Sequence, residues 1–149
     1  MTYLGDSTQS HVKMKLDSVL ASVQTVEEST ESFAREAGFD EDDASQIAMV
    51  AREAAVNAVV HGNKYDTAKH VTFSCALTDQ ELRVQVADEG PGLDPESIPN
   101  PLAPENLLRS SGRGVFLMKA IMDEVHFRQL TPGTEITLVK RRISKEIDA

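Results

Sequence analysis

Apolar side chains recur along the first part of the chain with two different periods. They alternate over residues 12–16, a pattern that predicts a β-strand with one buried face. Over residues 19–37 they recur about every 3.6 residues, which predicts an amphipathic helix. Asp17 and Ser18 are residue types that cap the start of a helix, and Gly38 is a residue type that ends one. The chain is therefore expected to open with a strand followed by a capped helix.

A second helix is predicted from the acidic residues at 40–43 to about Val60, and its residues 47–60 are apolar except for Arg52, Glu53 and Asn57. A helix this apolar is expected to be largely buried. The acidic residues at 40–43 suit the positive end of its dipole, and we interpret them as a solvated helix start. Glu53 and Asn57 lie one turn apart, so their side chains are expected on the same side of the helix.

The rest of the chain predicts two hairpins, a long loop and a third helix. We expect strands at 71–77 and 82–86 joined by Thr78-Asp79-Gln80, a loop at 88–111, a helix at 114–122, and strands at 125–127 and 136–138 joined through Pro132-Gly133. Strands and helices do not alternate strictly in this order. The order favours an α+β fold, a two-layer sandwich with helices on one face of a mostly antiparallel sheet.

The length predicts a single domain, which we place at residues 11–142. Residues 1–10 and 143–149 are expected to be flexible tails. The basic run Lys140-Arg141-Arg142 is expected to form a solvated end of the domain.

Composition narrows the classes of function. The formal net charge is −9 and aromatic residues make up only 5% of the chain, so neither a basic nucleic-acid surface nor an aromatic stacking platform is expected. Cys75 is the single cysteine, and the alternating pattern around it predicts a small core residue. No signal peptide is recognisable at residues 1–10, and no apolar run reaches the roughly 20 residues of a membrane span. These features predict a cytoplasmic protein without membrane contacts.

Glu53 and Asn57 are candidate functional residues because buried polar groups are costly unless something pairs with them. An asparagine can give a neutral oxygen to a hard cation such as Mg²⁺, which takes few protein ligands and fills its shell with phosphate oxygens. A glutamate can accept a proton from a hydroxyl or orient a water molecule. The alternative is a helix whose two polar groups bond neighbouring loops.

A second candidate is the run Asp88-Glu-Gly-Pro-Gly92 at the end of a predicted strand. A carboxylate there can accept a hydrogen bond from an exocyclic amino group such as that of adenine, and Gly90 and Gly92 let the backbone approach a planar ring. The alternative is an ordinary turn that ends a strand. Thr134 opens the last strand and could assist base recognition, although threonine suits a strand in any case.

A third candidate is the run from Ser110 to Gly114, where glycines enter a predicted helix and expose free N–H groups to an anion. The chain has neither a Walker A loop nor a Gly-x-Gly-x-x-Gly motif. Arg109 and Arg113 are candidate phosphate contacts, and Arg113 is equally well explained as a surface residue. Residues 93–111 are typical of a lid or binding loop, with an inert insertion as the alternative.

These motifs follow one another in a specific order. They read Glu53-Ala-Ala-Val-Asn57-Ala-Val-Val-His61-Gly62, Asp88-Glu-Gly-Pro-Gly92, Gly112-Arg-Gly-Val-Phe-Leu-Met118 and Gly133-Thr-Glu-Ile136. The series resembles the N, G1, G2 and G3 boxes of the Bergerat-type (GHKL) ATPase/kinase superfamily. Within it, the small size and the runs Asn-Ala-Val-Val-His-Gly and Ser-Gly-Arg-Gly-Val-Phe-Leu-Met resemble the anti-sigma factor serine/threonine kinases of the RsbW and SpoIIAB type. The resemblance covers nearly the whole chain.

The resemblance implies the Bergerat ATP-binding fold, ATP and Mg²⁺ as cofactors, and phosphorylation of a serine or threonine on another protein. It implies that Glu53 is the catalytic base and that Asn57 is the Mg²⁺ ligand. Asp88 would read the adenine amino group, with Thr134 supporting it through water. The other nucleotide contacts that the resemblance implies are His61, Gly90, Gly92, Arg109, Gly112, Arg113, Gly114 and Val115.

The resemblance also implies partners. An anti-anti-sigma protein of the STAS fold would be the substrate, and a sigma factor and a second copy of the chain would be further partners. The expected function is a partner-switching regulator of transcription. One alternative is a regulatory module that holds ATP and transfers nothing, against which Glu53 argues. Another is the catalytic domain of a histidine kinase, which would require a phospho-acceptor helix pair.

Overall fold

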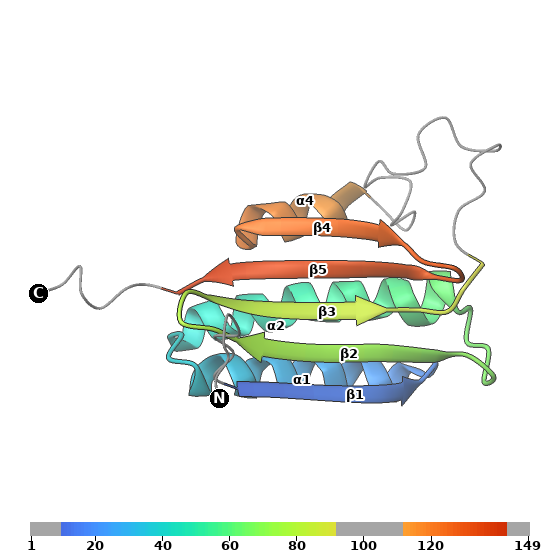
Figure 1. Cartoon of the computed structure of the whole chain (residues 1–149), viewed down its shortest axis with the longest axis horizontal. Helices are drawn as coiled ribbons and strands as arrows, with labels where there is room; N and C mark the ends of the chain where they lie inside the picture. The colour runs from blue at the N-terminus through green and yellow to red at the C-terminus, as the bar shows by residue number, and fades with distance from the viewer. Residues whose placement is uncertain (1–9, 92–111, 143–149) are drawn as a thin grey trace, which may run out of the picture.

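A five-stranded antiparallel sheet with helices on one face forms the structure, a computed structural model that describes residues 10–91 and 112–142 (Figure 1). The elements are β1 (Ser10–Asp17), α1 (Leu20–Glu36), α2 (Glu41–Val56), η1 (Asn57–Gly62), β2 (His70–Leu77), β3 (Glu81–Ala87), α4 (Gly112–Ile121), β4 (Glu124–Gln129) and β5 (Thr134–Arg141). The strand order in the sheet is β1-β2-β3-β5-β4, with every neighbouring pair antiparallel. The predicted α+β two-layer fold and the order of its elements are confirmed.

The core lies between the sheet and the helices. Alternate residues of β2 are buried, including Phe73 and Cys75 with 0% exposure, and they meet the apolar faces of α1 and α2, which pack against each other. Burial raises the pKa of the Cys75 thiol to about 12. The prediction that Cys75 is a small core residue is therefore confirmed.

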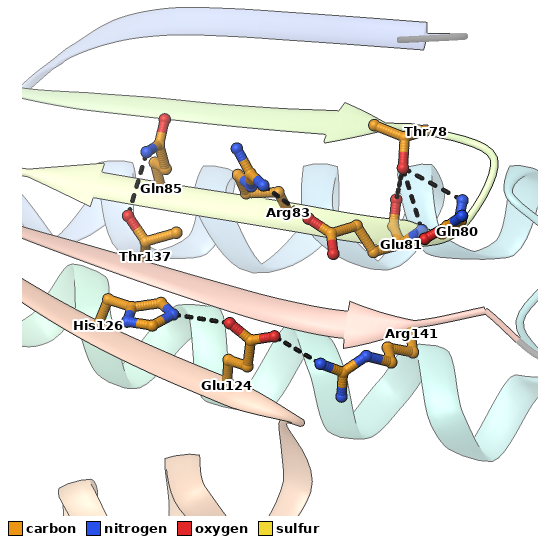
Figure 2. Close-up of polar contacts among 9 residues, drawn as sticks. All are labelled: Thr78, Gln80, Glu81, Arg83, Gln85, Glu124, His126, Thr137 and Arg141. Atoms are coloured by element: carbon orange, nitrogen blue, oxygen red, sulfur yellow. Dashed lines mark hydrogen bonds and ion pairs between the residues drawn. The ribbon is translucent and has the colours of Figure 1, made fainter. Parts of the chain in front are cut away.

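The opposite face of the sheet is polar (Figure 2). Gln85 on β3 donates a hydrogen bond to Thr137 on β5 at 3.1 Å. Near the edge of the sheet, Glu124 on β4 contacts the ring of His126 at 2.8 Å and the guanidinium of Arg141 at 2.6 Å. The Gln85–Thr137 and Glu124–Arg141 pairs join neighbouring strands and suit a solvated surface, which explains why one layer of helices is enough to complete the core.

The starts of the two long helices differ. Asp40 caps α2, because its carboxylate accepts a hydrogen bond from the backbone N–H of Asp43 at 2.8 Å. The prediction of a side-chain cap on α1 was wrong: its N-cap is Val19, which makes no such bond. Ser18 is instead fully buried, and its hydroxyl donates to the carbonyl of Lys69 at 2.7 Å. The long-range partner outcompetes the local cap.

The second helix does not continue as an α-helix to residue 60, as the sequence pattern predicted. It ends at Val56 and is followed by η1, a π-helical turn that runs to Gly62. The backbone N–H of Asn63 bonds the carbonyl of Ala58 at 2.8 Å, five residues earlier. Such a wider turn is frequent at functional sites, because it changes the direction of the side chains that follow it.

Two further predictions need correction, one on the start of the domain and one on its basic end. Ser10, which we expected in a flexible tail, is the first residue of β1. The basic C-terminal run is not simply solvated. Lys140 donates to the carbonyl of Ile121 at 2.7 Å, and Arg142 donates to the carbonyl of Thr78 at 2.8 Å. These residues therefore hold the end of β5 against its neighbours.

The predictions for residues 1–9, the loop segment 92–111 and the tail 143–149 lie outside the described residues. Within the described ranges, none of the helices combines the length and the apolar character that crossing a bilayer requires.

Thr30 on α1 provides a test of the core. Its side chain is fully buried beside the Cys75 thiol, and its hydroxyl has no hydrogen-bond partner of good geometry among the described residues. Thr30→Val removes the buried hydroxyl and keeps the shape, so we expect the free energy of unfolding to rise by about 1 kcal/mol in urea denaturation. Thr30→Ser is the control, because it keeps the hydroxyl and should lower stability by about 0.8 kcal/mol through the lost methyl group. A less stable Thr30→Val would show that the thiol is a significant partner.

Candidate functional site

The buried helix α2 leads directly to the first part of the site. Its core-facing side is rich in small apolar residues, and Asn57 follows its last turn with only 5% exposure. The Asn57 side-chain nitrogen donates to the backbone carbonyl of Glu53 at 2.9 Å. This bond joins residues one helical turn apart. It is therefore not a bond to a neighbouring loop, which was the alternative explanation for the polar residues of this helix. The bond sets the orientation of the Asn57 carboxamide on the helix.

Asp88 lies immediately after β3 and is almost buried, with 9% exposure. Its Oδ1 accepts hydrogen bonds from the backbone N–H groups of Gly90 at 3.0 Å and Thr134 at 3.2 Å. The backbone N–H of Asp88 in turn bonds the carbonyl of Thr134 at 3.0 Å. Burial raises the pKa of Asp88 above its ordinary value, and the two N–H bonds oppose this shift.

Three glycines surround Asp88 so closely that no side chain fits at any of them, and we call Gly62, Gly90 and Gly133 the glycine cradle. A Cβ atom at Gly62 would overlap the Asp88 carboxylate, and one at Gly90 would overlap the carbonyl oxygen of Gly62. Gly133 has φ +112°, and a Cβ there would overlap the Asp88 carbonyl. The cradle brings the end of η1, the end of β3 and the β4–β5 turn together around one carboxylate.

The start of α4 lies against Glu53. A Cβ built on Gly114 would be 3.8 Å from Oε1 of Glu53. The start of α4, which contains Gly112 and Gly114, therefore faces the predicted catalytic carboxylate. Val115 is buried with 8% exposure, and Met118 one turn later is fully buried, which anchors α4 in the core. The fold therefore brings Glu53, one helical turn before Asn57, close to the first turn of α4.

The remaining predicted site residues fall into three groups. His61 is exposed within η1, and Thr134 contacts Asp88 directly through its backbone rather than through its hydroxyl. Gly112 and Arg113 form the start of α4, where only the backbone is described. Gly92 and Arg109 lie outside the described residues.

Asn63 is a buried residue near Asp88 whose contacts the sequence did not reveal. It is 1% exposed, and its carboxamide bonds three other parts of the chain around Asp88. The next two residues, Lys64 at φ +52° and Tyr65 at φ +61°, adopt left-handed conformations that cost about 1 kcal/mol or more each. An asparagine after a helix-ending glycine resembles an ordinary turn residue, so the sequence alone carried no signal for its role.

Comparison with known proteins shows which family this fold belongs to. Residues 16–140 match the histidine kinase-like ATPase domain family, so the chain belongs to that family of ATP-binding domains. A crystal structure of the RsbU and RsbW domains of a Mycobacterium tuberculosis protein superposes with TM-score 0.66 at 21% identity, over 91% of this chain and 34% of that one. The catalytic domain of the histidine kinase ThkA superposes with TM-score 0.53 at 15% identity, over 87% of this chain and 97% of that one.

Sequence relatives define the group within the family. Serine-protein kinase RsbW of Staphylococcus epidermidis is 28% identical over 90% of this chain and 88% of its own length. Anti-sigma F factor of Geobacillus stearothermophilus is 34% identical over 70% of this chain and 74% of its own length. The chain therefore belongs to the RsbW and SpoIIAB type, as the order of its motifs indicated.

The burial of Asp88 predicts a pH-dependent stability. Because its folded-state pKa lies above the ordinary 3.8, the folded chain holds a proton that the unfolded chain releases, so its contribution to stability falls as pH rises through this interval. In Asp88→Asn the side-chain oxygen can still accept both N–H bonds, and the titration is gone. In urea unfolding curves, we expect the variant to gain stability relative to the parent as pH rises from about 4 through the folded-state pKa of Asp88, with no further gain above it. A difference independent of pH would contradict this account.

Proposed function

We propose that the chain is an ATP-dependent protein serine/threonine kinase that acts as a partner-switching anti-sigma regulator. The observation that carries the proposal is the position of Glu53. Its carboxylate lies against Gly114 at the start of α4, one helical turn from the buried Asn57. A nucleotide-binding domain needs groups for the base and the phosphates, whereas a carboxylate beside the phosphate end is needed for transfer to a hydroxyl.

At one end of the site, Asp88 would bind the adenine. Its Oδ1 is already engaged by two backbone N–H groups, so a carboxylate oxygen remains to accept the exocyclic amino group. The glycine cradle supports this assignment, because the missing Cβ atoms let the backbone surround the carboxylate closely. The buried Asp88 carboxylate can only accept a hydrogen bond. It therefore discriminates strongly against a base that presents an acceptor where adenine presents its amino group.

At the other end, Asn57 and the first turn of α4 would bind the phosphates with their metal ion. Within the described parts of the chain, His, Cys, Asp and Glu form no cluster that could bind a metal ion by itself. This fits Mg²⁺, which binds through one or two protein oxygens and otherwise through phosphates and water. Asn57 would give its carboxamide oxygen, and the helix N-terminus of α4 would give N–H groups to phosphate oxygens.

Glu53 would act on the protein substrate. Mg²⁺-ATP supplies the phosphoryl group, and the chain has to align the acceptor hydroxyl with it and accept the hydroxyl proton. Glu53 is only partly buried, and the packed start of α4 beside it limits its positions. A carboxylate held in place in this way serves as the general base.

The partners are inferred from the relatives. Two of them carry the names serine-protein kinase RsbW and anti-sigma F factor. A sigma factor and an anti-anti-sigma protein of the STAS fold, phosphorylated on serine or threonine, are the partners that fit such names. Arg109 or Arg113 would add a positive charge at the transferred phosphate, and a second copy of the chain would complete a homodimer.

Glu53→Gln tests phosphoryl transfer separately from nucleotide binding. The amide keeps the shape of the side chain and cannot take a proton, so we expect transfer to fall about 100-fold or more while the ATP dissociation constant changes less than about threefold. The assay uses γ-labelled ATP, Mg²⁺ and a STAS-domain protein from the same genomic neighbourhood. Glu27→Gln is the matched control, because Glu27 pairs with Arg52 at 3.4 Å on the adjoining helix α1 and should leave transfer unchanged.

Two outcomes of this assay would contradict the proposal in different ways. Parent protein that binds ATP but labels no STAS-domain substrate would indicate a regulatory module without phosphotransfer. Folded parent protein that takes up no ATP in calorimetry would overturn nucleotide binding itself.

Asp88→Asn tests adenine recognition. The asparagine would present an amide donor to the adenine amino group, so we expect the ATP dissociation constant to rise at least about tenfold, while binding of GTP is not weakened. Calorimetry with both nucleotides measures the ratio. Since the same variant is expected to be at least as stable as the parent at neutral pH, a loss of ATP binding cannot be assigned to unfolding. Unchanged ATP affinity would exclude Asp88 as the adenine contact.

A further inference from the structure

The side chain of Asn63 joins four segments of the chain at one point. Its nitrogen donates to the hydroxyl of Ser18 at 2.9 Å and to the carbonyl of His70 at 3.0 Å. Its oxygen accepts from the backbone N–H of Glu89 at 2.8 Å. The junction of β1 and α1, the end of η1, the start of β2 and the end of β3 therefore meet at a single carboxamide that is 1% exposed.

This carboxamide acts on the residues next to Asp88. Gly62, the neighbour of Asn63, lies against the Asp88 carboxylate and against Gly90, so residues 62 and 63 together hold the segment from 88 to 90. The Glu89 side chain adds a bond from the backbone N–H of His70 at 2.7 Å, which ties the same segment to β2. The position of Asp88 is thus fixed from η1 as well as from β5.

A second observation indicates that the direction of Asn63 is set at a cost. Lys64 and Tyr65 follow it with φ +52° and φ +61°. Residues other than glycine and asparagine rarely adopt this left-handed backbone conformation. Strained backbone of this kind persists only where surrounding contacts require it, and it is frequent beside functional sites. Here the strained pair turns the chain away directly after the carboxamide has entered the core.

We propose that Asn63 is a positioning residue for adenine recognition, one that fixes Asp88 relative to the helix bearing Glu53 and Asn57. This inference rests on the proposed function, because it assigns Asp88 to the base and Asn57 to the metal-bound phosphates. Asn63 lies six residues after Asn57 and is connected to it by η1, so one carboxamide links the phosphate end of the site to the base end. Asn63 itself touches no nucleotide in this proposal.

A positioning role and a purely structural role predict different kinetics. If Asn63 only stabilises the fold, its loss lowers the amount of active protein, and kcat falls while KM for ATP stays the same. If Asn63 positions Asp88, its loss raises KM for ATP with little change in kcat, since Glu53, Asn57 and α4 are anchored separately by the core. It also lowers the preference for ATP over GTP, because a displaced Asp88 reads the amino group less well.

The experiment compares Asn63→Ala with Ser18→Ala in the full chain. Ser18→Ala removes one partner of Asn63 and the bond to Lys69, but it keeps the bond to Glu89, so it is the matched control. We expect Asn63→Ala to raise KM and the dissociation constant for ATP about tenfold, with kcat within about threefold of the parent. Ser18→Ala should lose stability while its ATP affinity stays within about twofold.

The contrary results are distinct. Folded Asn63→Ala with the parental ATP affinity and ATP-to-GTP preference would overturn the positioning role, although the kinase proposal would stand. Parent protein that binds no ATP would overturn both. Should neither Asn63→Ala nor Asn63→Ser fold, amide hydrogen exchange on the parent protein decides: a Glu89 amide protected as strongly as the core strands supports the proposal, and a rapidly exchanging one refutes it.

Discussion

The structure depends on holding one carboxylate, that of Asp88, out of water at the point where three segments converge. The convergence is sterically allowed only because Gly62, Gly90 and Gly133 carry no side chains. The charge is tolerated because backbone N–H groups of Gly90 and Thr134 point at it. The same desolvation that raises the Asp88 pKa strengthens any hydrogen bond that a ligand donates to it. Burial of the Asp88 carboxylate therefore both costs stability when the group is charged and strengthens its bond to a ligand donor.

The opposite end of the site is supported in another way. Glu53 and Asn57 belong to a helix whose other residues are mostly apolar and packed against the sheet, so the helix cannot shift without opening the core. Rigid support of this kind suits phosphoryl transfer, which requires alignment of the reacting groups more than covalent assistance. Asn63 then relates this rigid helix to the Asp88 segment. In the proposed site, the two ends of the ligand would therefore rest on different supports, coupled through the buried side chain of Asn63.

In this family, one fold serves more than one kind of kinase. The ThkA catalytic domain shares the fold at 15% identity, and fold likeness alone does not choose between a histidine kinase and a serine kinase. The choice rests on the sequence relatives, which are named serine-protein kinase RsbW and anti-sigma F factor.

The sequence by itself determined the order of the elements, because hydrophobic periodicity is a local property that reflects which face is buried. It also predicted Glu53, Asn57, Asp88 and the glycines of the motifs as site residues, because these residues form motifs of fixed spacing. The structure brings Glu53 close to Gly114 and bonds Asp88 to Gly90. Only the tertiary structure decided what depends on partners distant in the chain, such as the burial of Ser18 in place of a helix cap. The role of Asn63 belongs here too, since its partners at positions 18, 70 and 89 come together only when the sheet and helices pack.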